Sequence, residues 1–155
     1  MPFQIHALPA QPFAALSALS DADLSARLVQ RQLVDKQPGY PCRVSLEDAQ
    51  VGETVYLLHY THQAAATPFR ASHAIYVREG VASATVPRGE VPQMIRNRII
   101  SLRAFDATGM MVNADLTEGE AVATRIDSLF QHPDTDYLHL HFAKQGCFAA
   151  RVSRV

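Results

Sequence analysis

The stretch from Tyr137 to Val152 holds the densest group of chemically reactive side chains in this sequence. Polar and apolar residues alternate along it, which predicts two β-strands, and Lys144-Gln145-Gly146 fits the three-residue loop of a β-hairpin. This loop sets a register in which His139 lies opposite Arg151. One face of the hairpin then carries two imidazoles, a thiol, a phenol and a guanidinium: Tyr137, His139, His141, Cys147 and Arg151.

The predicted register also defines the other face of the hairpin. It pairs Ala143 with Cys147 and His141 with Ala149. The even-numbered positions form a continuous apolar face suited to packing on a core: Leu138, Leu140, Phe142, Phe148, Ala150 and Val152. We therefore expect the reactive side chains on the face away from the core.

A thiol beside an imidazole could act as a nucleophile. The thiolate is the attacking form, and a nearby histidine and arginine would favour it. Cys147 has such neighbours in the predicted register, so the catalytic candidates are His139, His141 and Cys147. The alternative is structural, because free cysteine is among the most buried residue types and usually behaves as a small hydrophobic residue.

Two histidines two positions apart on a strand could also bind one metal ion. Their side chains point the same way, with Cα atoms about 7 Å apart. A structural zinc needs four protein ligands and a catalytic zinc three. Cys147, diagonal to His141, could be a third ligand, and His59 or His73 could supply one from another strand. Nothing in the sequence fixes which, so we expect no metal and no cofactor. One histidine would then bond a cross-strand partner and the other would be solvated.

Arginines in or beside the predicted strands could bind an anion. A guanidinium holds a carboxylate or phosphate through two parallel hydrogen bonds. Cys42 precedes Arg43 at a turn-to-strand junction, where backbone amides could stabilise an oxyanion. The ligand-binding candidates are Cys42, Arg43, Arg103 and Arg151. The alternative is that these arginines are ordinary solvated side chains.

The composition limits the class of protein. A chain of 155 residues, 48% hydrophobic, suits a single domain over residues 1–155 with a substantial core. The net charge of -1 gives no general attraction for nucleic acid or an anionic membrane, so we expect neither as a partner. The N-terminus lacks the pattern of a signal peptide, and two cysteines make no disulfide framework. We therefore expect a cytoplasmic protein.

Two helices are predicted. Ser20 with Asp23 has the spacing of a capping box, and the helix should run to near Lys36, before Pro38-Gly39. Thr117 with Glu120 has the same spacing ahead of an apolar stripe. That stripe is formed by Val122, Ile126, Leu129 and Phe130. A short helical turn from Leu46 to Ala49 is also expected.

Strands are predicted at Phe3–Leu8, Glu53–Tyr60, Ser72–Glu79, Arg98–Asp106 and Met110–Ala114, before the final hairpin. Most connections are too short for crossover helices, which favours antiparallel pairing. The fold class is therefore α+β: an antiparallel sheet with two main helices packed on one face, ending in a β-hairpin. Helices on the apolar face would leave the histidine face uncovered.

Several stretches together resemble one family. They are Gly-Tyr-Pro-Cys-Arg-Val-Ser-Leu-Glu-Asp-Ala at 39–49, Pro-Phe-Arg-Ala-Ser at 68–72, Ser-Leu-Arg-Ala-Phe-Asp at 101–106, His-Phe-Ala at 141–143 and Gly146-Cys147. These are similar to the bacterial family DUF1203, small uncharacterised proteins of about this length. The loop at His73-Ala74 departs from the Gly-Pro of that pattern. The resemblance implies a bacterial source and no activity, so no catalytic residue is carried over.

Two functional hypotheses follow. The first is a non-catalytic cytoplasmic module that binds a small anionic ligand or a protein partner, as a homodimer through a sheet face or edge. The second is a small hydrolase-like enzyme that uses the His139, His141, Cys147 and Arg151 face. Convergence of the histidines and a cysteine in a concavity would favour the enzyme, and a flat or covered face would favour the module.

Overall fold

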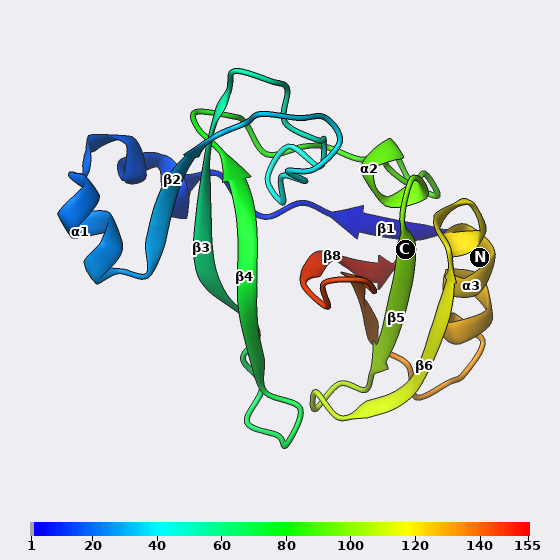
Figure 1. Ribbon diagram of the computed structural model, residues 1–155. Helices are drawn as coiled ribbons and strands as arrows, with labels where there is room; N and C mark the ends of the chain where they lie inside the picture. The colour runs from blue at the N-terminus through cyan, green and yellow to red at the C-terminus, as the bar shows by residue number, and fades with distance from the viewer. Residues whose placement is uncertain (1) are drawn as a thin grey trace. The chain divides into compact units, whose positions relative to one another are not determined.

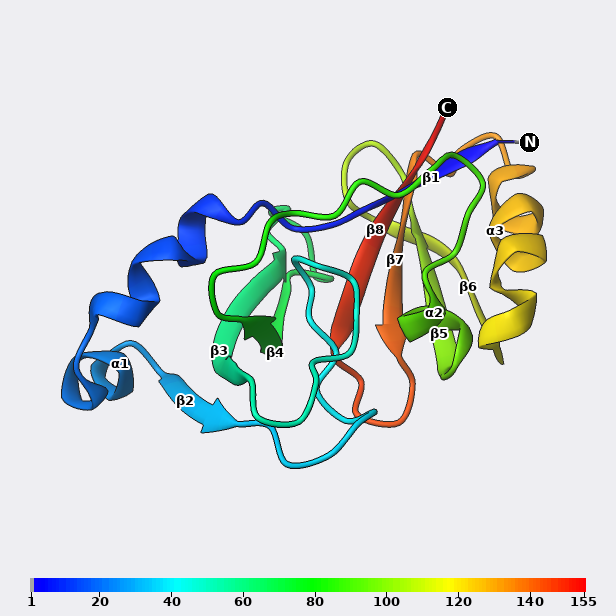
Figure 2. The same cartoon turned by 90° about the horizontal axis from the view of Figure 1, so that it is seen from above.

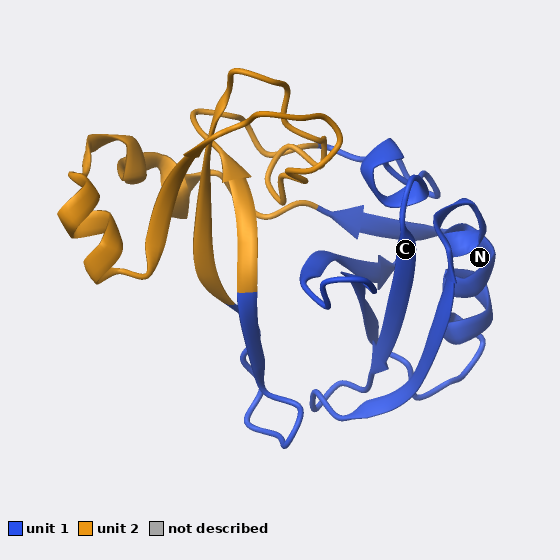
Figure 3. Ribbon diagram, in the orientation of Figure 1, with its two compact units in different colours: residues 1–6, 61–73, 85–155 blue, residues 7–60, 74–84 orange. Residues whose placement is uncertain are grey.

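The computed structural model describes residues 2–155, shown in two views in Figure 1 and Figure 2. The chain forms two compact units (Figure 3). Unit 1 takes residues 1–6, 61–73 and 85–155, and unit 2 takes residues 7–60 and 74–84. Each unit contains segments that are distant in the sequence, and the expectation of a single domain over residues 1–155 stays a prediction.

Unit 1 is built on a five-stranded antiparallel sheet with the order β1-β8-β7-β5-β6 (Figure 2). Its strands are β1 (Phe3–His6), β5 (Ile99–Phe105), β6 (Met111–Glu118), β7 (Tyr137–Phe142) and β8 (Phe148–Arg154). Two hairpins, β5–β6 and β7–β8, lie side by side, and β1 pairs with β8 at the edge. The predicted C-terminal hairpin is confirmed.

One face of this sheet is the apolar core of unit 1. The register aligns Ile5, Val152, Leu138 and Ala104 across four strands, and each is at most 1% exposed. Helix α3 (Val122–Phe130) covers this face: it packs against β5 and β6 (Figure 2), and Arg154 of β8 places its guanidinium 4.7 Å from the Phe130 ring centroid. The apolar stripe predicted for this helix is buried as a whole.

Unit 2 contains most of a three-stranded sheet with the order β2-β3-β4: β2 (Val29–Leu33), β3 (Thr54–Gln63) and β4 (Ala71–Arg78). The ends of β3 and β4, residues 61–63 and 71–73, belong to unit 1. Unit 2 also contains a 3₁₀ helix η1 (Gln11–Ala18) and helix α1 (Asp21–Ala26). Its core includes Leu24, Val44, Tyr56, Ile75 and Val77. The remaining elements, α2 (Gln93–Arg96) and η2 (Gly119–Ala121), lie in unit 1.

The fold class is α+β with antiparallel sheets, as expected, but its details differ. Residues 2–155 form two sheets rather than one, and the helices are divided between the units. The predicted helix from Ser20 to Lys36 ends at Ala26, although Ser20 does cap it, its Oγ accepting the Asp23 N–H at 3.1 Å. Leu28 then turns the chain with φ +59°, and Val29 begins β2. Pairing with β3 overrides the helical spacing of the leucines.

Two other helical predictions were wrong. Thr117 does not cap a helix, because it pairs with Ile100 in the β5–β6 ladder and α3 begins only at Val122. The predicted helical turn at residues 46–49 is a tight loop, in which Leu46 has φ +53° and Pro41 bridges Asp48. No helix within residues 2–155 combines the length and the hydropathy needed to cross a membrane.

Candidate functional site

A row of basic side chains crosses the second face of the five-stranded sheet. The register aligns His6 with Arg151, Arg151 with His139, and His139 with Arg103, on β1, β8, β7 and β5. Directly opposite side chains in such a ladder have Cβ atoms about 5 Å apart. We call these four residues the histidine–arginine row. The predicted pairing of His139 with Arg151 is confirmed, and β5 adds Arg103 on the other side of His139.

The hairpin register changes beyond this row. A bulge between Leu140 and His141 pairs His141 with Phe148, not with Ala149 as predicted. The loop causes the shift, because Phe142 donates its N–H to the Cys147 carbonyl at 2.9 Å and Gly146 adopts φ +82°. Phe148 was predicted to lie on the apolar face, but its ring centroid lies 5.2 Å from that of His139 and 5.9 Å from that of His141.

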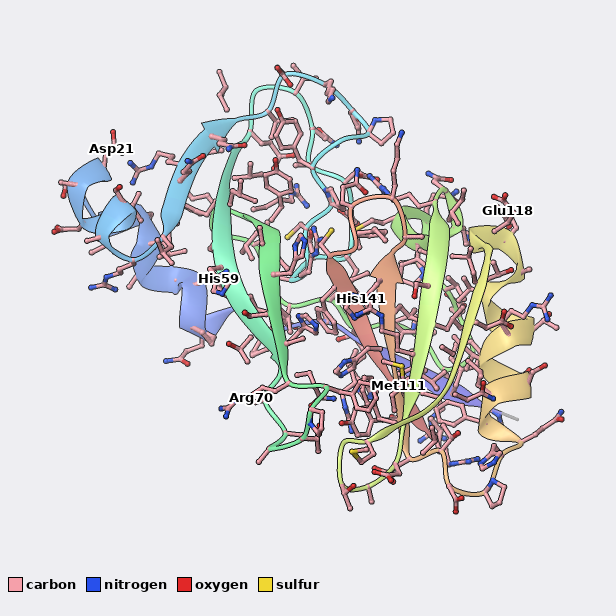
Figure 4. All side chains as sticks on the ribbon, turned by 60° about the horizontal axis from the view of Figure 1, so that its bottom comes forward. Asp21, His59, Arg70, Met111, Glu118 and His141 are labelled. Atoms are coloured by element: carbon pink, nitrogen blue, oxygen red, sulfur yellow. The ribbon has the colours of Figure 1, made fainter. Side chains whose placement is uncertain are left out.

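A third histidine covers this face. His62, at the end of β3, has its ring centroid 4.8 Å from that of His141 and 6.1 Å from that of His139, and it stacks on Phe148 at 5.6 Å. His139 and His141 are consequently 3% and 1% exposed. The expectation of an uncovered histidine face was therefore wrong. His141 lies on the side of the sheet away from α3 (Figure 4). We call His62, His139 and His141 the histidine cluster.

Each ring of the histidine cluster has a buried nitrogen without a hydrogen-bond partner in the described chain: Nδ1 of His62, Nδ1 of His139 and Nε2 of His141. The tautomer of His141 follows from its other nitrogen, which lies 3.0 Å from the Gly146 carbonyl oxygen. A carbonyl only accepts, so Nδ1 of His141 carries the proton and Nε2 carries a lone pair. The His141 acceptor is thus fixed by the hairpin loop.

The cluster is neutral at pH 7. Burial, with smaller effects from neighbouring histidines and arginines, lowers the pKa of His139 to about 3. Burial also lowers the pKa of His141 to about 3, against the opposing effect of its bond to Gly146. The pKa of His62 falls to about 4 for the same reason, with Arg103 and His73 contributing. The positive charge at this face therefore comes from arginine.

The two arginines of the row have no acidic partner among residues 2–155. Arg103 is partly buried and forms no ion pair or hydrogen bond with any residue from 2 to 155, and burial lowers its pKa. Arg151 is exposed and places its guanidinium 4.6 Å from the Tyr137 ring centroid, its one contact of this kind in the described chain. Tyr137 is held in turn, because its hydroxyl accepts from Nε2 of the buried Gln63 at 2.9 Å.

The catalytic candidate Cys147 lies in the loop before β8 and is 8% exposed. The bulge makes Phe148, instead of Cys147 or Ala149, the residue beside His141. Within residues 2–155, no three histidine, cysteine, aspartate or glutamate side chains are placed to hold a metal ion together. Both cysteines are free thiols.

The other ligand-binding candidates, Cys42 and Arg43, belong to unit 2. The Cys42 thiol is fully buried, and its Sγ accepts backbone N–H groups of Ser45 at 3.4 Å and Arg78 at 3.2 Å. Arg43 is 1% exposed and donates to the Pro41 carbonyl at 2.5 Å, while its own N–H donates to the Tyr76 carbonyl. These contacts tie the 39–49 loop to β4 and to itself, which is a structural role.

Sequence reasoning missed His62, because the predicted strand ended two residues before it. The signal was present in Thr61-His62-Gln63, which continues the alternation of the strand.

A family model described as "Protein of unknown function (DUF1203)" matches residues 39–154, in agreement with the resemblance of the short stretches. Searches among curated proteins and among solved structures found no match.

Proposed function

The chain belongs to the DUF1203 family, whose function is unknown, and we propose from the site alone that unit 1 is a non-catalytic module that binds a small anionic ligand at the histidine–arginine row. The observation that carries this proposal is the Arg103 guanidinium, partly buried and without a counter-ion among residues 2–155. Removing a charge from water without pairing it costs free energy. An anion bound there would recover that cost.

The placement of the two arginines supports one shared ligand. Arg103 and Arg151 are the cross-strand neighbours of His139 on its two sides. Neighbouring strands lie about 4.8 Å apart, and the two arginines are two strands apart, so the Cα atoms of Arg103 and Arg151 are separated by roughly 10 Å. Two long side chains can reach one ligand between them across this distance. Hydrogen bonds to charged groups contribute about 1.5–3 kcal/mol each, so two of them correspond to a Kd between about 6 mM and 0.04 mM.

The structure offers less support for hydrolysis. A nucleophile needs a general base within hydrogen-bond reach. Phe148 is the cross-strand neighbour of His141, and its ring lies against two of the three histidines. The two guanidiniums and the neutral imidazoles of His62 and His139 can instead donate hydrogen bonds to an anion without a reacting thiol.

Isothermal titration calorimetry with inorganic phosphate at low salt tests the proposal. Arg103→Gln and Arg151→Gln should each weaken binding at least fivefold, because each removes one charged donor. The matched control is Arg125→Gln on α3, which is half-exposed and pairs with Asp115 at 3.6 Å on a different part of unit 1. Arg125→Gln should bind as the wild type does. Absence of binding at about 20 mM, above the whole expected Kd range, to phosphate, sulfate, hydrogen carbonate, nitrate, glycolate and acetate alike would refute the proposed function.

A further inference from the structure

The strongest specificity element in unit 1 is the lone pair on Nε2 of His141. This nitrogen is buried, the ring is 1% exposed, and no donor in residues 2–155 reaches it. The loop bond from Nδ1 to the Gly146 carbonyl prevents the ring from presenting an N–H at Nε2 instead, since that bond requires the proton on Nδ1. A buried acceptor left without a donor costs about 1–3 kcal/mol.

The other two rings of the cluster have no such restriction. Nδ1 of His62 and Nδ1 of His139 are buried and unpartnered within the described chain, and no hydrogen bond from this chain fixes either tautomer. Either ring can therefore turn an N–H towards an anion. The cluster thus combines one obligatory acceptor with two adaptable groups, beside the positive charge of Arg103, which acts on all three rings.

We propose that the ligand bound by unit 1 is an oxyanion that also carries an O–H group, and that this O–H donates to Nε2 of His141 while the charged oxygens face Arg103 and Arg151. The inference rests on the anion-binding function proposed above and narrows its ligand class. Hydrogen phosphate, hydrogen carbonate and α-hydroxy carboxylates share this chemistry. A fully deprotonated oxyanion of the same shape leaves the acceptor unpaired and brings a negative charge towards its lone pair.

Matched pairs of anions test the inference at pH 7. Phosphate keeps an O–H and sulfate does not, and the same difference separates hydrogen carbonate from nitrate and glycolate from acetate. A site built around a hydrogen bond to a hydroxyl discriminates strongly against the analogue without it. By calorimetry, at least one pair should show the O–H member binding at least tenfold more tightly, and the preferred pair identifies the class of acid.

His141→Phe removes the acceptor and keeps an aromatic ring among its aromatic neighbours. In this variant the two anions of the preferred pair should bind with affinities that differ by no more than about twofold. The anion without a hydroxyl then no longer leaves a buried acceptor unpaired, so the free-energy difference between the two anions disappears. The matched control is His132→Gln, an exposed residue after the end of α3, which should keep the wild-type ratio. The ratio is informative even if the variant is less stable, because both anions are measured on the same protein.

Nitrogen NMR of the wild-type protein tests the same hydrogen bond without a substitution. The ¹⁵N resonance of His141 Nε2 should shift as an accepting nitrogen gains a donor when the O–H member is added, and it should not shift with the other member. Equal affinities within every pair, with no change at Nε2, would overturn this inference and leave the anion-binding function standing. Failure of all six anions to bind would instead refute the proposed function itself.

Discussion

Lowering the pH from 7 to 5 should destabilise the folded chain through His139 and His141. Both rings are buried, and their pKa values are about 3 in the folded state. In the unfolded chain a histidine titrates near its ordinary value of 6.5. Between these values the unfolded chain binds protons that the folded chain does not, so stability is fully present above pH 6.5 and is lost as the pH falls towards 3.

The magnitude follows from the two pKa values. Each pH unit below 6.5 costs about 1.4 kcal/mol per histidine, so at pH 5 each ring has lost about 2 kcal/mol and the pair about 4 kcal/mol. Domains are stable by only about 5–15 kcal/mol, so this is a large fraction. For a chain of this size it corresponds to a fall in Tm of roughly 10 °C.

Urea denaturation at pH 7, 6 and 5 measures the effect, with tyrosine fluorescence and circular dichroism as the signals. His139→Phe removes one ring whose folded-state pKa is lowered, so its loss of stability between pH 7 and 5 should be smaller than the wild-type loss by about 2 kcal/mol. His59→Gln changes an exposed ring on β3 and should keep the wild-type loss. If His139→Phe loses as much stability as the wild type over this range, the burial argument is wrong.

Two further predictions concern the fold. Gly119→Ala should destabilise the chain by at least about 2 kcal/mol in urea denaturation, because an added Cβ would lie 2.2 Å from a backbone carbonyl oxygen of α2. Gly39→Ala is the control. The atom nearest to its added Cβ belongs to a flexible lysine side chain, so this substitution should cost much less. Equal costs at the two glycines would contradict this reasoning. Ser20→Ala should cost about 1 kcal/mol by removing the acceptor for the Asp23 N–H, and Ser17→Ala, whose hydroxyl makes only a 3.5 Å contact, should be nearly neutral.

Local sequence patterns predicted the parts of the fold that depend on neighbouring residues. The alternation through Leu138 and Val152 identified the final hairpin and its register as far as Leu140. The 3.6-residue spacing identified the buried face of α3. The same kind of pattern failed at Leu28 and Leu33, which are 71% and 68% exposed, because β2 forms by pairing with a strand more than twenty residues away.

The candidate site also has some features that local sequence predicts and others that depend on tertiary packing. The sequence by itself determined that His139 and Arg151 face each other, because a hairpin loop controls its own register. Only the tertiary structure decided that β5 lies beside β7, which brings Arg103 to His139, and that His62 covers the cluster. Contacts between strands distant in sequence depend on packing of the whole unit, which local spacing does not encode. Those contacts bury the histidines, hold them neutral and leave the His141 lone pair without a donor from the described chain.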